Sequence, residues 1–167
     1  MRYCVFLLLA GCATVAPQTV AATFDPAEVA WFNRTGSNAI EGNAVMRTVG
    51  GEVRTCAGGD ANLIPVSTYA DERMLKMFGN TSGGLLSART GFSWSSTDPR
   101  YKAASRTVTC DSLGNFRFDR LPDGDYYVTA RVVWGVPNQY FTSWQGGYVM
   151  RRVTLRGGET MRLVLSA

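Results

Sequence analysis

The sequence contains no histidine among its 167 residues. Histidine is the side chain most used for acid/base chemistry near neutral pH, and it is the commonest metal ligand. Its absence excludes Ser/His/Asp and Cys/His catalysis. The aspartates are scattered, and no cleft is evident that would raise the pKa of one carboxyl group of a pair. We therefore predict a protein that is not an enzyme and that uses no cofactor.

Clusters of basic residues and long apolar runs are also missing. The 17 lysines and arginines exceed the 13 aspartates and glutamates, giving a net charge of +4, but they are dispersed along the chain. Dispersed charge is typical of a solvated surface and does not indicate nucleic-acid binding. The apolar run from Val5 to Leu9 is shorter than the roughly 17 residues that a membrane-spanning helix needs.

Residues 1–11 have the layout of a secretory signal peptide. Arg2 supplies a positive charge, an apolar run follows, and small residues precede Cys12. A buried strand or a shortened transmembrane helix is the alternative interpretation of this segment. The sequence Leu9-Ala10-Gly11-Cys12 resembles the bacterial lipobox, whose cysteine is lipidated at the cleavage site. This resemblance implies that Cys4 is removed with the signal peptide and that Cys12 becomes the membrane anchor.

The same resemblance implies a location in the cell envelope. An aspartate directly after the lipidated cysteine is the usual signal for the inner membrane of Gram-negative bacteria, and this chain has Ala13. We therefore expect a protein that is lipid-anchored, most simply in the outer membrane. Residues 12–24 are small and polar, and they are expected to comprise the lipidated cysteine and a flexible tether.

Two cysteines, Cys56 and Cys110, are left for the mature chain. In an oxidising compartment such a pair favours a disulfide. The alternatives are two buried free thiols or half of a zinc site, but zinc needs about four ligands and the chain does not offer them. We predict a disulfide between Cys56 and Cys110 and no metal site.

Period-two alternation of apolar residues dominates the chain after residue 37. In "NFRFDR", for example, Phe116 and Phe118 fall on one face and Arg117 on the other. Six to eight such segments, separated by turns, predict an all-β sandwich. A short helix is expected near residues 26–33, where Asp25 and Glu28 have the spacing of a capping box.

Three finer predictions follow from the same pattern. Pro65 lacks a backbone N–H group, so its strand is expected at a sheet edge or at a bulge. "YVMRRVTL" and "TMRLVLSA", joined by the turn "RGGE", are expected to pair as a terminal hairpin. The doubled tyrosine, Tyr126 and Tyr127, leaves open which of the two faces the core.

The stretch "TCDSLGNFRFDRLPDGDYYVTARV" resembles the carboxypeptidase regulatory-like, or prealbumin-like, domains. Its aspartate-to-glycine spacing is one residue longer than the commoner pattern of these domains. The resemblance implies a transthyretin-like sandwich of about seven strands over residues 25–167, with an insertion at about 69–105, and it implies little about activity. The signature positions are Asp111, Gly114, Phe116, Phe118, Leu121, Pro122, Gly124, Tyr126 or Tyr127, and Val128.

The turn "LPDGD" also admits a second interpretation. The carboxylates of Asp119, Asp123 and Asp125 could supply oxygen ligands to calcium, although the spacing is not that of an EF-hand. A solvated turn is the simpler interpretation and the one we predict.

The insertion contains a predicted helix in "ADERMLKMFGN", followed by a polar segment with three isolated aromatic residues. These residues, Phe92, Trp94 and Tyr101, could form a surface for a partner or ligand. They could equally belong to a lid that closes one edge of the sandwich. The sequence does not distinguish the two.

A second aromatic group occurs in "VVWGVPNQYFTSWQGGY", which we expect to be a loop between two strands. Trp134, Tyr140, Phe141 and Trp144 lie beside amide side chains, a combination that could bind sugars. Burial of these rings is the alternative, since large aromatic residues are usually buried.

The sequence thus predicts a lipid-anchored envelope module with a binding or structural role. Its first expected partner is another envelope protein, which would make it an accessory or scaffold lipoprotein. Its second is a glycan, bound through the 134–148 region.

Overall fold

The computed structural model describes residues 15–167, and its predicted β-sandwich is confirmed. Cys4 and Cys12, with the predictions attached to them, lie outside this range. Nine strands, rather than about seven, occur in the described part of the chain. In chain order the elements are η1 (Pro26–Asn33), β1 (Asn38–Arg47), β2 (Val53–Thr55), β3 (Asp60–Pro65), α1 (Thr68–Phe78), β4 (Gly83–Ser87), α2 (Pro99–Ala103), β5 (Arg106–Thr109), β6 (Asn115–Leu121), β7 (Gly124–Pro137), β8 (Thr142–Leu155) and β9 (Thr160–Leu165).

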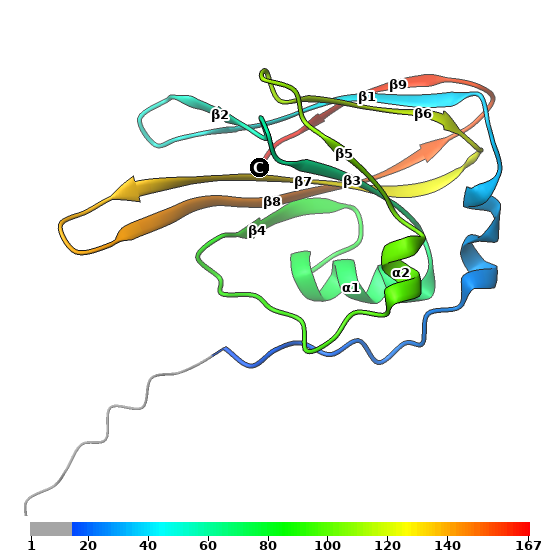
Figure 1. Cartoon of the computed structure of the whole chain (residues 1–167), viewed down its shortest axis with the longest axis horizontal. Helices are drawn as coiled ribbons and strands as arrows, with labels where there is room; N and C mark the ends of the chain where they lie inside the picture. The colour runs from blue at the N-terminus through cyan, green and yellow to red at the C-terminus, as the bar shows by residue number, and fades with distance from the viewer. Residues whose placement is uncertain (1–14) are drawn as a thin grey trace, which may run out of the picture.

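The strands form two sheets that stack face to face, with helices α1 and α2 on the outer side of the larger sheet (Figure 1). In the smaller sheet, β1 pairs with β2 and β6 in antiparallel fashion and with β9 in parallel. The larger sheet has the order β4-β8-β7-β3-β5. Its centre is a long antiparallel hairpin in which β7 and β8 pair along their whole length.

The predicted pairing of the two C-terminal strands is wrong. After β8 the chain leaves the larger sheet, and β9 pairs with β1 of the smaller sheet. Both edges of β8 are already paired, with β7 on one side and β4 on the other, so no edge is left for β9. Gly157 and Gly158 have φ angles of 68° and 82°, a conformation that glycine adopts without steric cost and that lets the chain turn toward β1.

The main core lies between the two sheets. Phe116 and Phe118 are buried there, as the alternation of their strand predicted, while Arg117 is exposed. Tyr126 faces this core and packs edge-on against Phe32. Burial of each such large apolar side chain contributes about 1.5–3 kcal/mol to folding. The Tyr126 hydroxyl donates a hydrogen bond of 2.6 Å to the carbonyl of Pro122, so its polar end is also satisfied.

A second core lies on the outer face of the larger sheet, where the insertion covers it. Tyr127 points to this side, which settles the orientation of the doubled tyrosine. The predicted helix is confirmed as α1: the Ser67 side chain caps its start, and Gly79, at φ 75°, ends it. Strand β4 and helix α2, which the sequence did not predict, complete the insertion. The buried residues of this second core are Phe24, Val29, Ile64, Tyr69, Ala70, Met74, Tyr101, Tyr127 and Met150.

Residues 18–24, which the sequence assigned to a flexible tether, are packed against the insertion. Gln18 forms an isolated bridge with Trp94. The carboxylate of Glu72 accepts hydrogen bonds from the backbone N–H groups of Ala21 and Ala22, at 2.9 Å and 2.7 Å. Phe24 is buried in the second core. Apolar contacts and charged hydrogen bonds therefore hold a segment whose composition alone indicated a spacer.

The predicted N-terminal helix is present, but as a 3₁₀ helix, η1. Asp25 caps it by accepting a hydrogen bond from the N–H group of Ala27, and Pro26 occupies its first turn. Glu28 does not complete a capping box. Its carboxylate instead accepts a hydrogen bond of 2.6 Å from the N–H group of Thr68, which ties η1 to the start of α1.

The prediction that Pro65 marks an edge strand or a bulge is wrong, because β3 lies between β7 and β5 and its register with β7 is continuous from Ala61 to Pro65. The pairing with β5 ends at Leu63, however, so Pro65 lies opposite Tyr126 of β7 and has no partner on the β5 side. Its missing N–H group therefore disrupts no ladder on that side.

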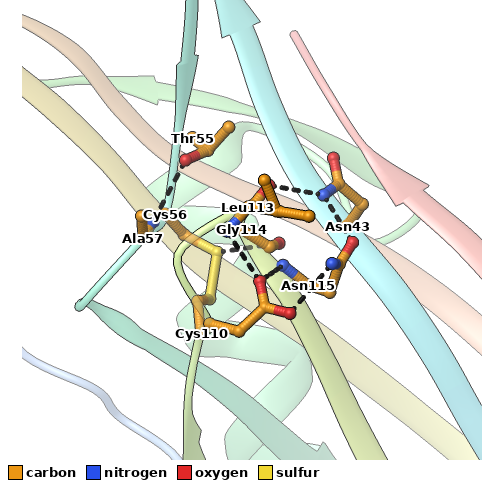
Figure 2. Close-up of a disulfide and its surroundings, with 9 residues drawn as sticks. Asn43, Thr55, Cys56, Ala57, Cys110, Leu113, Gly114 and Asn115 are labelled. Carbon is orange, nitrogen blue, oxygen red and sulfur yellow. Dashed lines mark hydrogen bonds between the residues drawn. A yellow bond between two sulfur atoms is a disulfide. The ribbon is translucent and has the colours of Figure 1, made fainter.

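The predicted disulfide between Cys56 and Cys110 is present, with the two Cα atoms 5.8 Å apart (Figure 2). Cys56 follows β2 and Cys110 follows β5, so the bond links two connections that each pass from one sheet to the other. Beside it, the Asp111 carboxylate accepts hydrogen bonds from the backbone N–H groups of Leu113 and Asn115. This turn is the "DSLGN" segment, and its role in the structure is to join the sheets.

Candidate functional site

A cleft of about 1070 Å³ opens at one end of the sandwich. At this end the β1–β2 hairpin and the long β7–β8 hairpin extend side by side away from the core (Figure 1). We call this site the end cleft. Its lining comprises Val45, Met46, Arg47, Thr48, Val49, Gly50, Val53, Leu85, Ser87, Arg89, Trp134, Val136, Gln145, Gly146, Ser166 and Ala167.

Among the described residues that line the end cleft, Trp134 is the one aromatic residue. It lies on the core-facing side of β7, two residues after the buried Val132, and its ring packs against the edge of the main core. Across the hairpin the chain has Gly146, at φ 78°. A Cβ atom there would lie 2.6 Å from the Trp134 ring, so only glycine leaves room for the indole. The ring is half-buried and forms part of the cleft surface.

A row of polar side chains adjoins this ring. Gln145 is the residue paired directly with Trp134 in the β7–β8 ladder. Its amide oxygen accepts a hydrogen bond from the guanidinium of Arg89, and its amide nitrogen donates one of 3.0 Å to the Ser143 hydroxyl. These contacts fix the amide beside the indole and bring a positive charge next to it.

The β1–β2 hairpin supplies the other wall of the end cleft. Val49 and Val53 are exposed apolar residues on this wall, and Arg47 adds a second guanidinium. Arg47 donates one hydrogen bond of 3.4 Å to the carbonyl of Gly51 within its own hairpin. The cleft thus combines an aromatic ring and aliphatic walls with a few hydrogen-bonding groups, the composition typical of small-ligand sites.

The structure divides the second predicted aromatic group among three places. The expected loop is the end of the β7–β8 hairpin, with a turn closed by a hydrogen bond of 3.0 Å from Asn138 N–H to the Phe141 carbonyl. Trp134 lines the cleft, whereas Trp144 pairs with Gly135 and lies on the opposite face of the hairpin. Tyr140 and Phe141 are at the tip and are 84% and 65% exposed.

The aromatic residues of the insertion gather around one buried arginine, Arg73. The Arg73 guanidinium lies 4.0 Å from the ring centroid of Trp94 and 4.9 Å from that of Tyr101. Phe92 packs edge-on against Trp94. Tyr101 is only 7% exposed, and this burial raises its pKa to about 12. These residues hold the insertion over the outer face of the larger sheet, and the Tyr101 ring is not available at the surface.

The three aspartates of the "LPDGD" region face donors of the protein itself. Asp119 pairs with Arg117. Asp123 accepts hydrogen bonds from the side chain of Asn38 and from the N–H group of Gly157. Asp125 has its pKa lowered by hydrogen bonds from Thr154 and Arg152 and by the charge of Arg156. Over residues 15–167, no group of three or more potential metal-ligating side chains comes together.

The sequence missed most of the end cleft. It singled out Trp134, but it identified neither Gln145 as its neighbour nor Arg47 and Arg89 as the charged groups. One signal for Gln145 was present: a turn at Asn138–Phe141 sets the register that places Gln145 opposite Trp134. Nothing local indicates that the β1–β2 hairpin or residues near Arg89 approach this position.

Among the described residues, no helix has the length and apolar character needed to cross a membrane. No protein-family model matches the chain, and no curated protein matches it. The fold is similar to the crystal structure of a Pseudomonas aeruginosa protein described as a putative carbohydrate binding protein. The two share 25% sequence identity with a TM-score of 0.74, and the alignment covers 87% of this chain and 99% of that one.

Proposed function

We propose that this protein binds a carbohydrate in the end cleft. The observation that carries the proposal is the pairing of Trp134 with Gln145 on adjoining strands, inside a cleft large enough for several sugar units. An aromatic ring offers the apolar face of a sugar a flat contact surface, and amide and guanidinium groups hydrogen-bond its hydroxyl groups. The similarity to a protein described as carbohydrate binding supports the same role.

Binding without catalysis is part of this proposal. The chain has no histidine, and the aspartate and glutamate side chains are not part of the cleft lining. The groups that are present can orient a sugar and exclude water from it, and a binding site needs no more than that.

The test is titration calorimetry of the purified protein with oligosaccharides chosen from a glycan array. Trp134→Ala is expected to weaken binding at least tenfold, because the ring that contacts the sugar is removed. Trp144→Ala is the matched control, since Trp144 lies on the other face of the same hairpin. It should change the affinity less than twofold.

Trp134 also packs against the core, so its replacement could lower stability. Gln145→Ala therefore serves as a second variant, because it removes only a polar group of the cleft. Thermal unfolding of each variant separates loss of fold from loss of binding. An array on which the intact protein binds no glycan would overturn the proposal, as would equal loss of affinity in the Trp134 and Trp144 variants.

A lipid anchor at Cys12 in the outer membrane is proposed from the lipobox resemblance alone. Gln18 is hydrogen-bonded to Ser93, and five residues separate it from Cys12. An extended chain of this length spans at most about 20 Å. The proposed anchor would therefore hold the insertion close to the membrane. Intact-mass measurement of the membrane-extracted protein tests this: an unmodified chain beginning at Met1 would contradict it.

An envelope protein partner is a second candidate function, favoured by the tip of the β7–β8 hairpin. Tyr140, Phe141 and Trp144 are all more than half exposed there. The variant that tests this role is Tyr140→Ser combined with Phe141→Ser. It changes only exposed residues of the tip and leaves the insertion, with β4 and the Arg73 contacts, intact. In a pull-down from envelope extract, the double variant is compared with the intact protein. Equal recovery of partners by the two would exclude the tip as the contact.

A further inference from the structure

We propose that the carbohydrate bound in the end cleft is acidic, with a uronic acid carboxylate held by Arg89 and Arg47. This inference rests on the proposed carbohydrate-binding function and specifies its ligand class. It is derived from the charge of the lining, the unused hydrogen-bond donors of the two arginines, and the position of Arg89 beside the aromatic ring.

The side chains that line the end cleft carry two positive charges and no negative one. Ala167, the last residue of the sequence, also lines the cleft, and its main-chain carboxylate would cancel one charge if the chain ends there. The lining is therefore positive in either case. A partly enclosed site of one sign of charge attracts ligands of the opposite sign more strongly than an open surface does.

Neither arginine of the cleft forms an ion pair within the described residues, so no carboxylate side chain of residues 15–167 neutralises either guanidinium. Arg47 donates to a backbone carbonyl, and Arg89 donates to the neutral amide oxygen of Gln145. A guanidinium has five N–H donors, so each arginine keeps donors for a carboxylate. The arginines that do pair with carboxylates are Arg54, Arg100, Arg117, Arg152 and Arg156.

The placement of Arg89 fits a sugar ring that carries its charge at one edge. Arg89 is hydrogen-bonded to Gln145, and Gln145 lies directly opposite Trp134 in the ladder. A pyranose lying against Trp134 would thus have the guanidinium within reach of a substituent at the ring edge. In a uronic acid that substituent is a carboxylate, which an arginine can bind through two parallel hydrogen bonds.

The probes are an oligogalacturonate and its methyl ester, which have the same sugar rings but differ in charge. The intact protein is expected to bind the acid at least tenfold more tightly than the ester, and the difference should shrink as salt is raised from 50 to 500 mM. Arg89→Gln and Arg47→Gln should each weaken binding of the acid about tenfold more than binding of the ester, so that the preference for the acid is lost.

Arg131→Gln is the matched control, because Arg131 is an exposed arginine on the other face of β7. It should leave both affinities unchanged. Equal affinity for acid and ester, or binding of neutral glycans only, would overturn the acidic-ligand inference while the proposed carbohydrate function survives. Loss of both affinities in Trp134→Ala would support that function, whereas no binding of any glycan would overturn both.

Discussion

The guanidinium of Arg73 lies 4.0 Å from the centroid of the Trp94 ring. Arg73 is only 7% exposed, and its Nη1 atom donates to the Thr97 hydroxyl at 3.2 Å, whereas its Nε atom has no hydrogen-bond partner among residues 15–167. Aromatic rings, rather than a carboxylate, therefore surround this buried charge. A desolvated guanidinium over an indole contributes about 2 kcal/mol, so this contact is expected to hold the polar part of the insertion in place.

A double-mutant cycle with Arg73→Met and Trp94→Leu measures this contact. Each single variant should lower the free energy of unfolding, and the coupling energy should be about 1–2 kcal/mol. Urea denaturation of the four proteins gives the values. Additive losses, with no coupling, would show that the two residues stabilise the insertion independently.

The disulfide is expected to contribute about 4 kcal/mol to stability, because it closes a 54-residue spacing and restricts the unfolded chain. Replacing Cys56 and Cys110 by serine should lower the free energy of unfolding by about this amount. The wild type should lose stability to the same extent in reducing agent, whereas the variant should not respond. Detection of free Cys56 or Cys110 thiols in the unreduced, denatured protein would contradict the prediction.

Docking of the N-terminal segment on Glu72 is expected to depend on pH. Hydrogen bonds from the N–H groups of Ala21 and Ala22 are the main cause that lowers the pKa of Glu72. Because the pKa of Glu72 is lowered in the folded state, ionised Glu72 stabilises the docked segment fully at pH values above the ordinary glutamate pKa of about 4.3. This stabilisation is lost as the pH falls through the folded-state pKa.

Amide NMR spectra measure this effect. The resonances of Ala21 and Ala22 should shift in one titration, with a midpoint below the ordinary pKa of glutamate. Glu72→Gln keeps a neutral acceptor but removes the titrating group, so the shift should disappear in that variant. A midpoint at or above the ordinary value would argue against the two hydrogen bonds.

Much of the fold could be predicted from local patterns. Alternation placed Phe116 and Phe118 in the core, and the helix signals in "ADERMLKMFGN" located α1 and its end at Gly79, although not its start at Ser67. The pairing of strands was harder to predict from the sequence. Strand β9 pairs with β1 on the other side of the sandwich, although its neighbour in the chain is β8. A strand pattern shows which face is buried, but it does not name the strand that supplies the hydrogen bonds, because that choice depends on which edges are free.

The sequence by itself determined the residue types available for function. It excluded histidine chemistry, favoured Cys56 and Cys110 as a disulfide pair, and singled out Trp134 among a few aromatic candidates. The tertiary structure decided which candidates share a site. The register of the β7–β8 hairpin places Trp134 beside Gln145 and turns Trp144 to the opposite face, because successive residues of a strand point to opposite sides. The approach of the β1–β2 hairpin then adds Arg47, from a segment nearly ninety residues away in the sequence, to the same cleft.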